Sequence, residues 1–151
     1  MHFEIHITVK QENEFKKYCE KEGWKPLKII LLSNTAKFPT QVMCSIRFKG
    51  EMNYGIEYSN DVLEAVSKNF DVQRMKLEVP YSSEFNKFVY HEVHVKSERF
   101  DHRGIYANSI NEWGDQKPLL TCRSKESLPT AFEFKEFGVI DYEAETVLID
   151  T

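Results

Sequence analysis

Two histidines lie at the centre of two short segments that share one pattern of polar and aliphatic residues. In each segment a glutamate, a histidine and a third polar residue alternate with aliphatic residues, giving Glu4, His6 and Thr8 in the first segment and Glu92, His94 and Lys96 in the second. Since an imidazole both accepts and donates protons near neutral pH, two of them in one cleft suit phosphodiester cleavage. A hydroxyl or ammonium group two residues further along a strand faces the same side and can hold a phosphate oxygen.

The same residues support two other interpretations. Two imidazoles and two carboxylates, from Glu4, His6, Glu92 and His94, are also a suitable ligand set for a divalent metal ion. A histidine on the polar side of a strand is, in addition, an ordinary surface residue in many proteins. The pattern alone leaves these alternatives open.

The elements that carry both histidines are predicted to be strands. Residues 3–9 alternate strictly, so that Phe3, Ile5, Ile7 and Val9 share one face and the polar residues share the other. Three further short matches follow the two histidine segments in the same order, namely residues 25–27 with 117–119, 39–40 with 129–130, and 48 with 137. We therefore predict an internal duplication, with halves at about residues 1–80 and 88–151.

Composition limits the class of protein. At 151 residues, with 41% apolar and 13% aromatic residues, the chain is expected to form a single globular domain. A net charge of −4 argues against general electrostatic binding of nucleic acid. The three cysteines are odd in number and widely spaced, which is typical of core residues in a reducing compartment. We find no apolar run that would span a bilayer and no signal-peptide pattern, so we expect a cytoplasmic protein without membrane association.

Hydrophobic periodicity predicts the remaining elements. In the first half we expect a helix over residues 11–22 that Gly23 ends, a loop at 33–37, a turn-rich connection at 50–58, a second helix over 60–70, and strands over 27–32, 41–48 and 72–79. In the second half we expect an irregular stretch over 100–116 and strands over 119–124, 131–137 and 146–150. This order predicts an α+β fold in which the two halves are related by a pseudo-twofold axis.

The segment from His6 to Val9 resembles the His-x-Thr-x motif of the 2H phosphoesterases, the LigT-like group that includes RNA 2′,3′-cyclic phosphodiesterases. The resemblance implies a duplicated fold of two lobes, with antiparallel or mixed sheets and helices on the outside. It implies that His6 and His94 are the catalytic pair, that Thr8 binds phosphate, and that no cofactor is needed. The implied substrate is a nucleotide or an RNA terminus, either a 2′,3′-cyclic phosphate or a cyclic nucleotide or oligonucleotide.

The second motif departs from this family, because Lys96 stands where a threonine or serine is usual. By alternation Ser97 points to the face opposite His94 and cannot replace that hydroxyl. Lys96 can bind the phosphate electrostatically, and Arg123 is a further candidate phosphate ligand. The alternative is a non-catalytic binding or interaction module that kept the duplicated fold.

A second resemblance concerns the metal-binding interpretation. Paired βαβββ modules of the vicinal-oxygen-chelate, or glyoxalase-like, proteins also begin with a histidine strand, and residues 15–23 are similar to theirs. That resemblance implies a metal-binding protein that uses the same histidines and glutamates. The helix expected at residues 60–70 does not belong in such a module.

Overall fold

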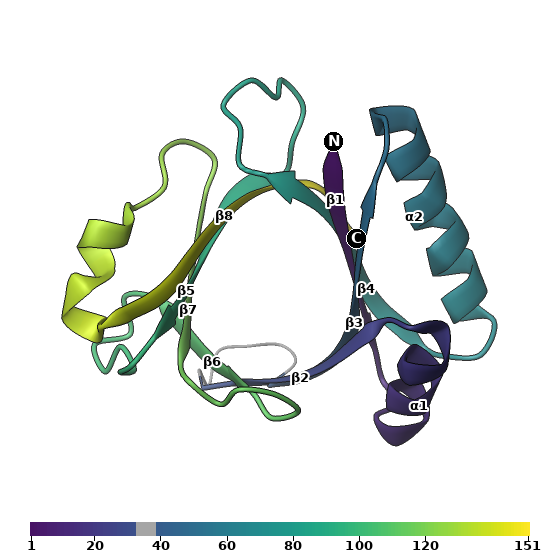
Figure 1. Ribbon diagram of the computed structural model, residues 1–151, viewed down its shortest axis with the longest axis horizontal. Coiled ribbons are helices and arrows are strands. Elements are labelled where there is room, and N and C mark those ends of the chain that lie inside the picture. Colours follow the sequence, from purple (N-terminus) through teal and green to yellow (C-terminus); the bar gives the residue numbers. More distant parts are fainter. Residues whose placement is uncertain (33–38) are drawn as a thin grey trace.

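The computed structural model describes residues 1–32 and 39–151, so the loop expected at residues 33–37 lies outside the described residues. Within the described residues, eight strands form one closed barrel in the order β1-β3-β2-β6-β7-β5-β8-β4, and every neighbouring pair is antiparallel. Figure 1 looks through this ring of strands, with the helices on its outside.

The strands and helices have the following bounds. The strands are β1 (His2–Val9), β2 (Lys25–Leu31), β3 (Thr40–Lys49), β4 (Val72–Pro80), β5 (Tyr90–Ser97), β6 (Ala107–Asn111), β7 (Leu119–Ser124) and β8 (Val139–Asp150). The helices of the described residues are α1 (Asn13–Glu22), α2 (Met52–Ser67) and the 3₁₀ helix η1 (Ala131–Phe137). None of these helices combines the length and the apolar character needed to cross a membrane.

The predicted fold class is wrong. We expected a duplicated α+β fold of two lobes with antiparallel or mixed sheets, whereas the described strands belong to one closed antiparallel barrel. The barrel closes because strands of the first half pair with strands of the second at two places, β2 with β6 and β4 with β8. Pairing between distant segments leaves no trace in local hydrophobic periodicity, so the sequence pattern could not distinguish one barrel from two sheets.

Several local predictions are confirmed. The helix expected at residues 11–22 is α1, and Gly23 ends it in the left-handed conformation with φ of 76°. The strand expected at 119–124 is β7, and those expected at 27–32, 41–48 and 72–79 match β2, β3 and β4 to within a few residues. Strong alternation and a glycine stop are local signals, which explains why they suffice.

Two local predictions are wrong. The turn-rich connection expected at residues 50–58 is the beginning of α2, where Gly55 lies directly against β1. A Cβ atom at Gly55 would lie 2.5 Å from the Phe3 ring, so the glycine permits a close approach of helix and strand. The strand expected at 131–137 is η1, in which Phe134 and Phe137 are both buried. Their spacing of three residues matches the three-residue turn of a 3₁₀ helix.

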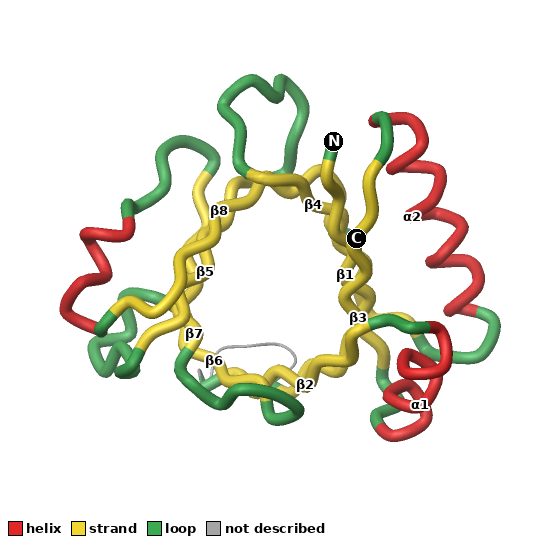
Figure 2. The backbone as a smooth tube through the Cα atoms, in the orientation of Figure 1, coloured by secondary structure: helices red, strands yellow, loops and turns green. Residues whose placement is uncertain are grey.

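The helices cover the outer surface of the barrel, and the apolar core lies between them and the strands. In β1 the outward residues Phe3, Ile5, Ile7 and Val9 are all buried. They belong to a cluster that also contains residues of α1, α2, β3 and β4. A smaller cluster lies between β5, β7 and η1, as the outward position of η1 in Figure 2 also indicates. The polar side of β1 therefore faces the interior of the barrel.

The two halves use their strands in the same spatial order. The first half contributes β4-β1-β3-β2 to the ring, and the second contributes β8-β5-β7-β6. This order makes β1 equivalent to β5, as the repeated histidine pattern predicts. The other short matches fall on elements that are not equivalent, because residues 25–27 begin β2 whereas 117–119 lead into β7. The duplication itself stays a prediction.

Candidate functional site

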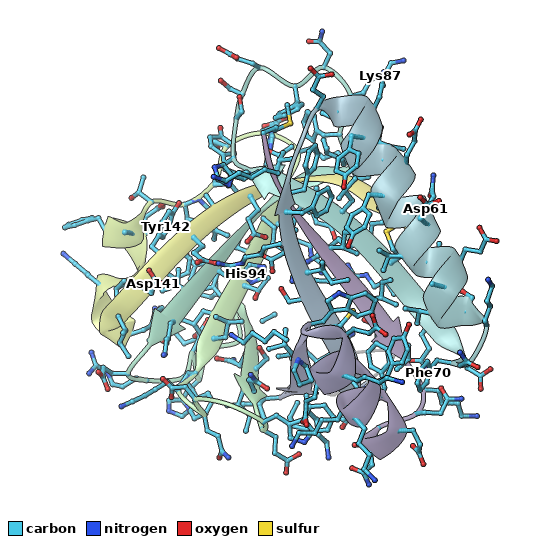
Figure 3. All side chains as sticks on the ribbon, turned by 45° about the vertical axis from the view of Figure 1, so that its right-hand side comes forward. Asp61, Phe70, Lys87, His94, Asp141 and Tyr142 are labelled. Atoms are coloured by element: carbon cyan, nitrogen blue, oxygen red, sulfur yellow. The ribbon has the colours of Figure 1, made fainter. Side chains whose placement is uncertain are left out.

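The barrel encloses a cavity of about 940 Å³ that contains both histidines. Four neighbouring strands, β1, β4, β5 and β8, supply a wall of charged side chains. His94, which Figure 3 labels, lies on the inner side of β5. A second pocket, of about 460 Å³, lies toward the beginning of β1, and its lining residues include Glu4, Glu78, Glu143 and Glu145.

Corresponding residues of the two halves form two similar groups. The first module consists of Glu4, His6, Ser45, Arg47 and Glu78, and the second of Glu92, His94, Thr121, Arg123 and Glu145. Strand register makes these residues equivalent: Glu4 lies opposite both Arg47 and Glu78, and Glu92 lies opposite both Arg123 and Glu145. His6 lies opposite Ser45 and His94 opposite Thr121. Tertiary structure thus extends the short repeat seen in the sequence to five residues in each half.

In the first module Glu4 accepts hydrogen bonds from three side chains. His6 Nε2 lies 2.5 Å from its carboxylate, Ser45 donates at 2.7 Å and Arg47 at 3.1 Å. Burial alone would raise the pKa of Glu4, but the hydrogen bonds from His6 and Ser45 and the charges of His6 and Arg47 lower it to about 2. Glu4 is therefore an anion at neutral pH, and it holds the imidazole of His6 in place.

In the second module Glu92 is fully buried and has three cationic or polar partners. Lys76 Nζ donates at 2.8 Å, His94 Nε2 lies at 2.7 Å, and Arg123 Nε donates to the second carboxylate oxygen. Burial opposes ionisation, but the hydrogen bond with His94 and the charges of Lys76 and Arg123 keep the pKa of Glu92 well below its ordinary value. The other ring nitrogen of His94, Nδ1, lies 3.0 Å from the hydroxyl of Thr121.

Glu78 and Glu145 are carboxyl groups of a different kind. Glu78 is only 1% exposed, and neither of its carboxylate oxygens has a hydrogen-bond partner among the described residues. One oxygen of Glu145 is also buried without a hydrogen-bond partner. The nearest cation to Glu78 is Lys76, at 3.5 Å. Burial, together with the negative charge of the neighbouring Glu78, raises the pKa of Glu145 well above its ordinary value.

Each histidine lies near one of these two carboxyl groups, so that each module contains a possible ligand set for a cation. His6 Nδ1 lies 3.7 Å from Glu78, and His94 Nε2 lies 3.8 Å from Glu145. Each module offers ligand atoms within 4.8 Å of one another, in the sets Glu4, His6, Glu78 and Glu92, His94, Glu145. Two atoms bound to one cation at about 2.1 Å lie roughly 3–4 Å apart, which fits the distances to Glu78 and Glu145. The direct hydrogen bonds of Glu4 and Glu92 to the histidines are shorter and leave no room for a cation between them.

All the predicted site residues lie in this cavity. Thr8 is 3% exposed and lines it, as do Lys96 and Arg123. Lys96 forms an ion pair with Asp115, and Arg123 pairs with Glu92. As alternation predicts, Ser97 points away from the cavity, and its hydroxyl donates to the carbonyl of Arg99. The roles of the predicted site residues in catalysis or phosphate binding stay predictions.

Sequence analysis missed Glu78 and Glu145. The signal was present, because Arg74, Lys76 and Glu78 alternate with outward apolar residues just as Glu4, His6 and Thr8 do. The chemistry went unnoticed because nothing in the sequence indicates that β4 and β8 are neighbours. Arg74 is less available than its position indicates, because Asp150 accepts two hydrogen bonds from it, at 2.7 and 2.6 Å.

Comparisons with family models, with curated proteins and with solved structures found no match to this chain.

Proposed function

We propose that the barrel binds a divalent cation together with a phosphorylated small molecule and hydrolyses the phosphate ester. The observation that carries this proposal is the pair of carboxyl groups of Glu78 and Glu145. A buried carboxylate without hydrogen bonds is costly, and a bound cation is the usual way in which proteins compensate for it. Carboxylate oxygens and imidazole nitrogens are ligands that Mn²⁺, Mg²⁺ and Zn²⁺ accept.

In this proposal the cation lies between Glu78 and Glu145, and His6 Nδ1, the ring nitrogen that does not contact Glu4, completes its ligands. This set differs from the metal-binding alternative of the sequence analysis, in which Glu4, Glu92 and His94 were ligands together with His6. Glu4 instead holds the imidazole of His6 through its other ring nitrogen, a role that carboxylates commonly have beside metal-binding histidines, and Glu92 holds Nε2 of His94.

The ligand's phosphate is proposed to lie near Lys76, Lys96 and Arg123, which line the same cavity. The positive charges of these three side chains are balanced by nearby carboxylates, since Glu92 pairs with Lys76 and Arg123, and Asp115 pairs with Lys96. A divalent cation adds two positive charges, so that the interior attracts an anion. A cation held there would polarise a phosphoryl oxygen and lower the pKa of a bound water, and that water would replace the ester oxygen on phosphorus while the leaving alcohol takes up a proton.

Calorimetric titration with Mn²⁺ tests the cation site. We expect the wild-type protein to bind Mn²⁺ and Glu78→Gln to lose at least about 100-fold in affinity, because a direct carboxylate ligand matters more than the outer partners, which contribute roughly 10–100-fold. Glu84→Gln changes an exposed glutamate and is the matched control. If Glu78→Gln binds Mn²⁺ as tightly as this control does, the proposed cation site is wrong.

A second candidate function uses the two histidines without a cation, as the 2H phosphoesterases do. The observation that favours it is that His6 and His94 line one cavity together with Thr8 and Lys96. In that case one imidazole accepts a proton from the attacking hydroxyl, and the other donates a proton to the leaving oxygen. The two-lobed fold implied by that resemblance is not part of this candidate.

Hydrolysis of adenosine 2′,3′-cyclic phosphate, p-nitrophenyl phosphate and a cyclic dinucleotide, with and without EDTA, distinguishes the two candidates. Loss of turnover in EDTA that added Mn²⁺ restores supports the cation-dependent function. Turnover that persists in EDTA supports the two-histidine mechanism. Under either candidate His6→Ala lowers the rate by roughly 10²–10⁴-fold. His102→Ala, which changes an exposed histidine outside the cavity, leaves the rate unchanged.

A further inference from the structure

The wall of the cavity opposite the charged strands carries a strip of apolar side chains among polar ones. It is built from β3, β2, β6 and β7, which follow one another in the ring. Its cavity-lining residues include Leu27, Ile29 and Leu31 on β2, Met43 on β3 and Leu119 on β7. Charged side chains and apolar side chains therefore face each other across the cavity.

These apolar side chains are not part of the packed cores. Leu27, Ile29 and Leu31 lie outside both buried clusters, and each remains partly exposed to the cavity. Every second residue of β2 points inward, and three successive inward positions are aliphatic. In β1, by contrast, the inward positions are occupied by polar residues. An apolar strip inside a cavity that also contains charged groups is typical of a small-molecule site, where it contacts the apolar part of the ligand.

The strip also has a definite size. From Leu27 to Leu31 the strand rises about 13 Å, at about 3.3 Å per residue. Met43 lies opposite Leu27 in the register of β2 and β3, which broadens the strip at that end. At its other end the neighbouring strand β6 contributes Asn111 and Ser109, opposite Ile29 and Leu31. The apolar strip is thus long enough to contact a hydrocarbon chain of several carbon atoms, and a ligand with a single methyl or hydroxymethyl group would cover only a small part of it.

We propose that the ligand is amphiphilic: an organic phosphate whose hydrocarbon body lies on the strip of Leu27, Ile29, Leu31 and Met43 while its phosphate faces the charged wall. This inference rests on the proposed function, since it assumes that the charged wall binds the phosphate. It excludes inorganic phosphates as the preferred ligands, because they leave the strip without a partner. The class that fits best is an alkyl or prenyl phosphate or diphosphate.

A matched pair of probes tests the strip. Geranyl diphosphate and inorganic pyrophosphate share a diphosphate group and differ in the hydrocarbon chain. In calorimetry with Mn²⁺ present, we expect the wild-type protein to bind geranyl diphosphate at least about tenfold more tightly, the effect of removing some tens of Å² of apolar surface from water. Ile29→Asn and Leu27→Gln each abolish this preference and leave pyrophosphate affinity unchanged. Leu32→Asn, which changes an exposed leucine next to β2, preserves it.

Each outcome has a distinct meaning. Equal affinity of the wild-type protein for both probes overturns the apolar-body inference and leaves the phosphate site standing. A preference for geranyl diphosphate that survives both inward substitutions also overturns it, because the hydrocarbon chain then lies elsewhere. Binding of neither probe overturns the proposed function itself, and with it this inference. Thermal melting shows that each variant is folded before titration.

Discussion

The first and second modules have equivalent residues, but their surroundings differ in sign of charge and in exposure. The clearest difference is the residue that lies opposite each histidine on the neighbouring strand. Lys76 of β4 is opposite His6, whereas Glu143 of β8 is opposite His94. Lys76 donates to Glu92 of the second module, so the first half supplies a buried cation to the second. Glu143 instead lines the second pocket together with Glu4, Glu78 and Glu145.

This exchange of charge gives the modules different environments. Glu92 is fully buried among Lys76, Arg123 and His94, whereas the side chain of Glu4 is 17% exposed and its partner Arg47 is 72% exposed. Two groups with the same residue types can therefore differ in what each contributes. The buried Glu92 is paired with a buried lysine, whereas the partly exposed Glu4 is paired with an exposed arginine. We infer that the second module contributes more to stability.

The largest expected effect comes from neutralising the two equivalent glutamates in turn. Glu92→Gln leaves Lys76 and Arg123 without their anion and is expected to lower the free energy of unfolding by about 3–5 kcal/mol. Glu4→Gln is expected to cost less, about 1–3 kcal/mol, because one of its partners, Arg47, is mostly exposed to solvent. Chemical denaturation of both variants measures the difference. Equal costs would show that the modules are not distinct in this respect.

A smaller effect separates cation binding from stability. Because the raised pKa of Glu145 keeps its carboxyl group largely protonated at neutral pH, Glu145→Gln is expected to change the free energy of unfolding by less than about 1 kcal/mol. The same substitution removes a proposed cation ligand and is expected to weaken Mn²⁺ binding by roughly 30-fold, or about 2 kcal/mol. Denaturation and calorimetry on the same preparation measure both. A large loss of stability with unchanged Mn²⁺ affinity would contradict the assignment.

Lys96 tests the departure of the second histidine strand from the first. Lys96→Thr restores the residue type found at Thr8, and we expect it to weaken binding of a phosphorylated ligand by roughly tenfold, because a charge-assisted contact is lost. Stability should change little, since the ion pair of Lys96 with Asp115 is half exposed. Activity that rises in Lys96→Thr would instead show that the second strand is a degenerate copy of the first.

The smallest effect concerns the hydroxyl that holds the first module together. Ser45 donates to Glu4 at 2.7 Å, and Ser45→Ala is expected to lower the free energy of unfolding by about 0.5–1.5 kcal/mol. Denaturation midpoints compared with Ser82→Ala, a change in the loop after β4, measure it. A neutral result would show that Arg47 and His6 suffice to hold Glu4.

Much of the local structure could be predicted from particular residues. The alternation in residues 3–9 correctly separates the buried Phe3, Ile5, Ile7 and Val9 from the polar Glu4, His6 and Thr8. The stretch around Gly55 was misjudged, because a glycine and nearby polar residues are typical of turns when seen alone. In the folded chain this glycine lies in α2 and lets the helix approach Phe3 of β1 closely.

By itself, then, the sequence determined which residues share a strand face and that two histidine strands carry the same pattern, because both properties depend on neighbours along the chain. Only the tertiary structure decided that the outer faces of the strands carry the packed cores and that the inner faces, charged on one side and partly apolar on the other, enclose one cavity. It also decided that Glu78 and Glu145 meet, because they belong to β4 and β8, which pair only when the barrel closes. Strand pairing between distant segments depends on the packing of the whole chain, and so does the proposed cation site.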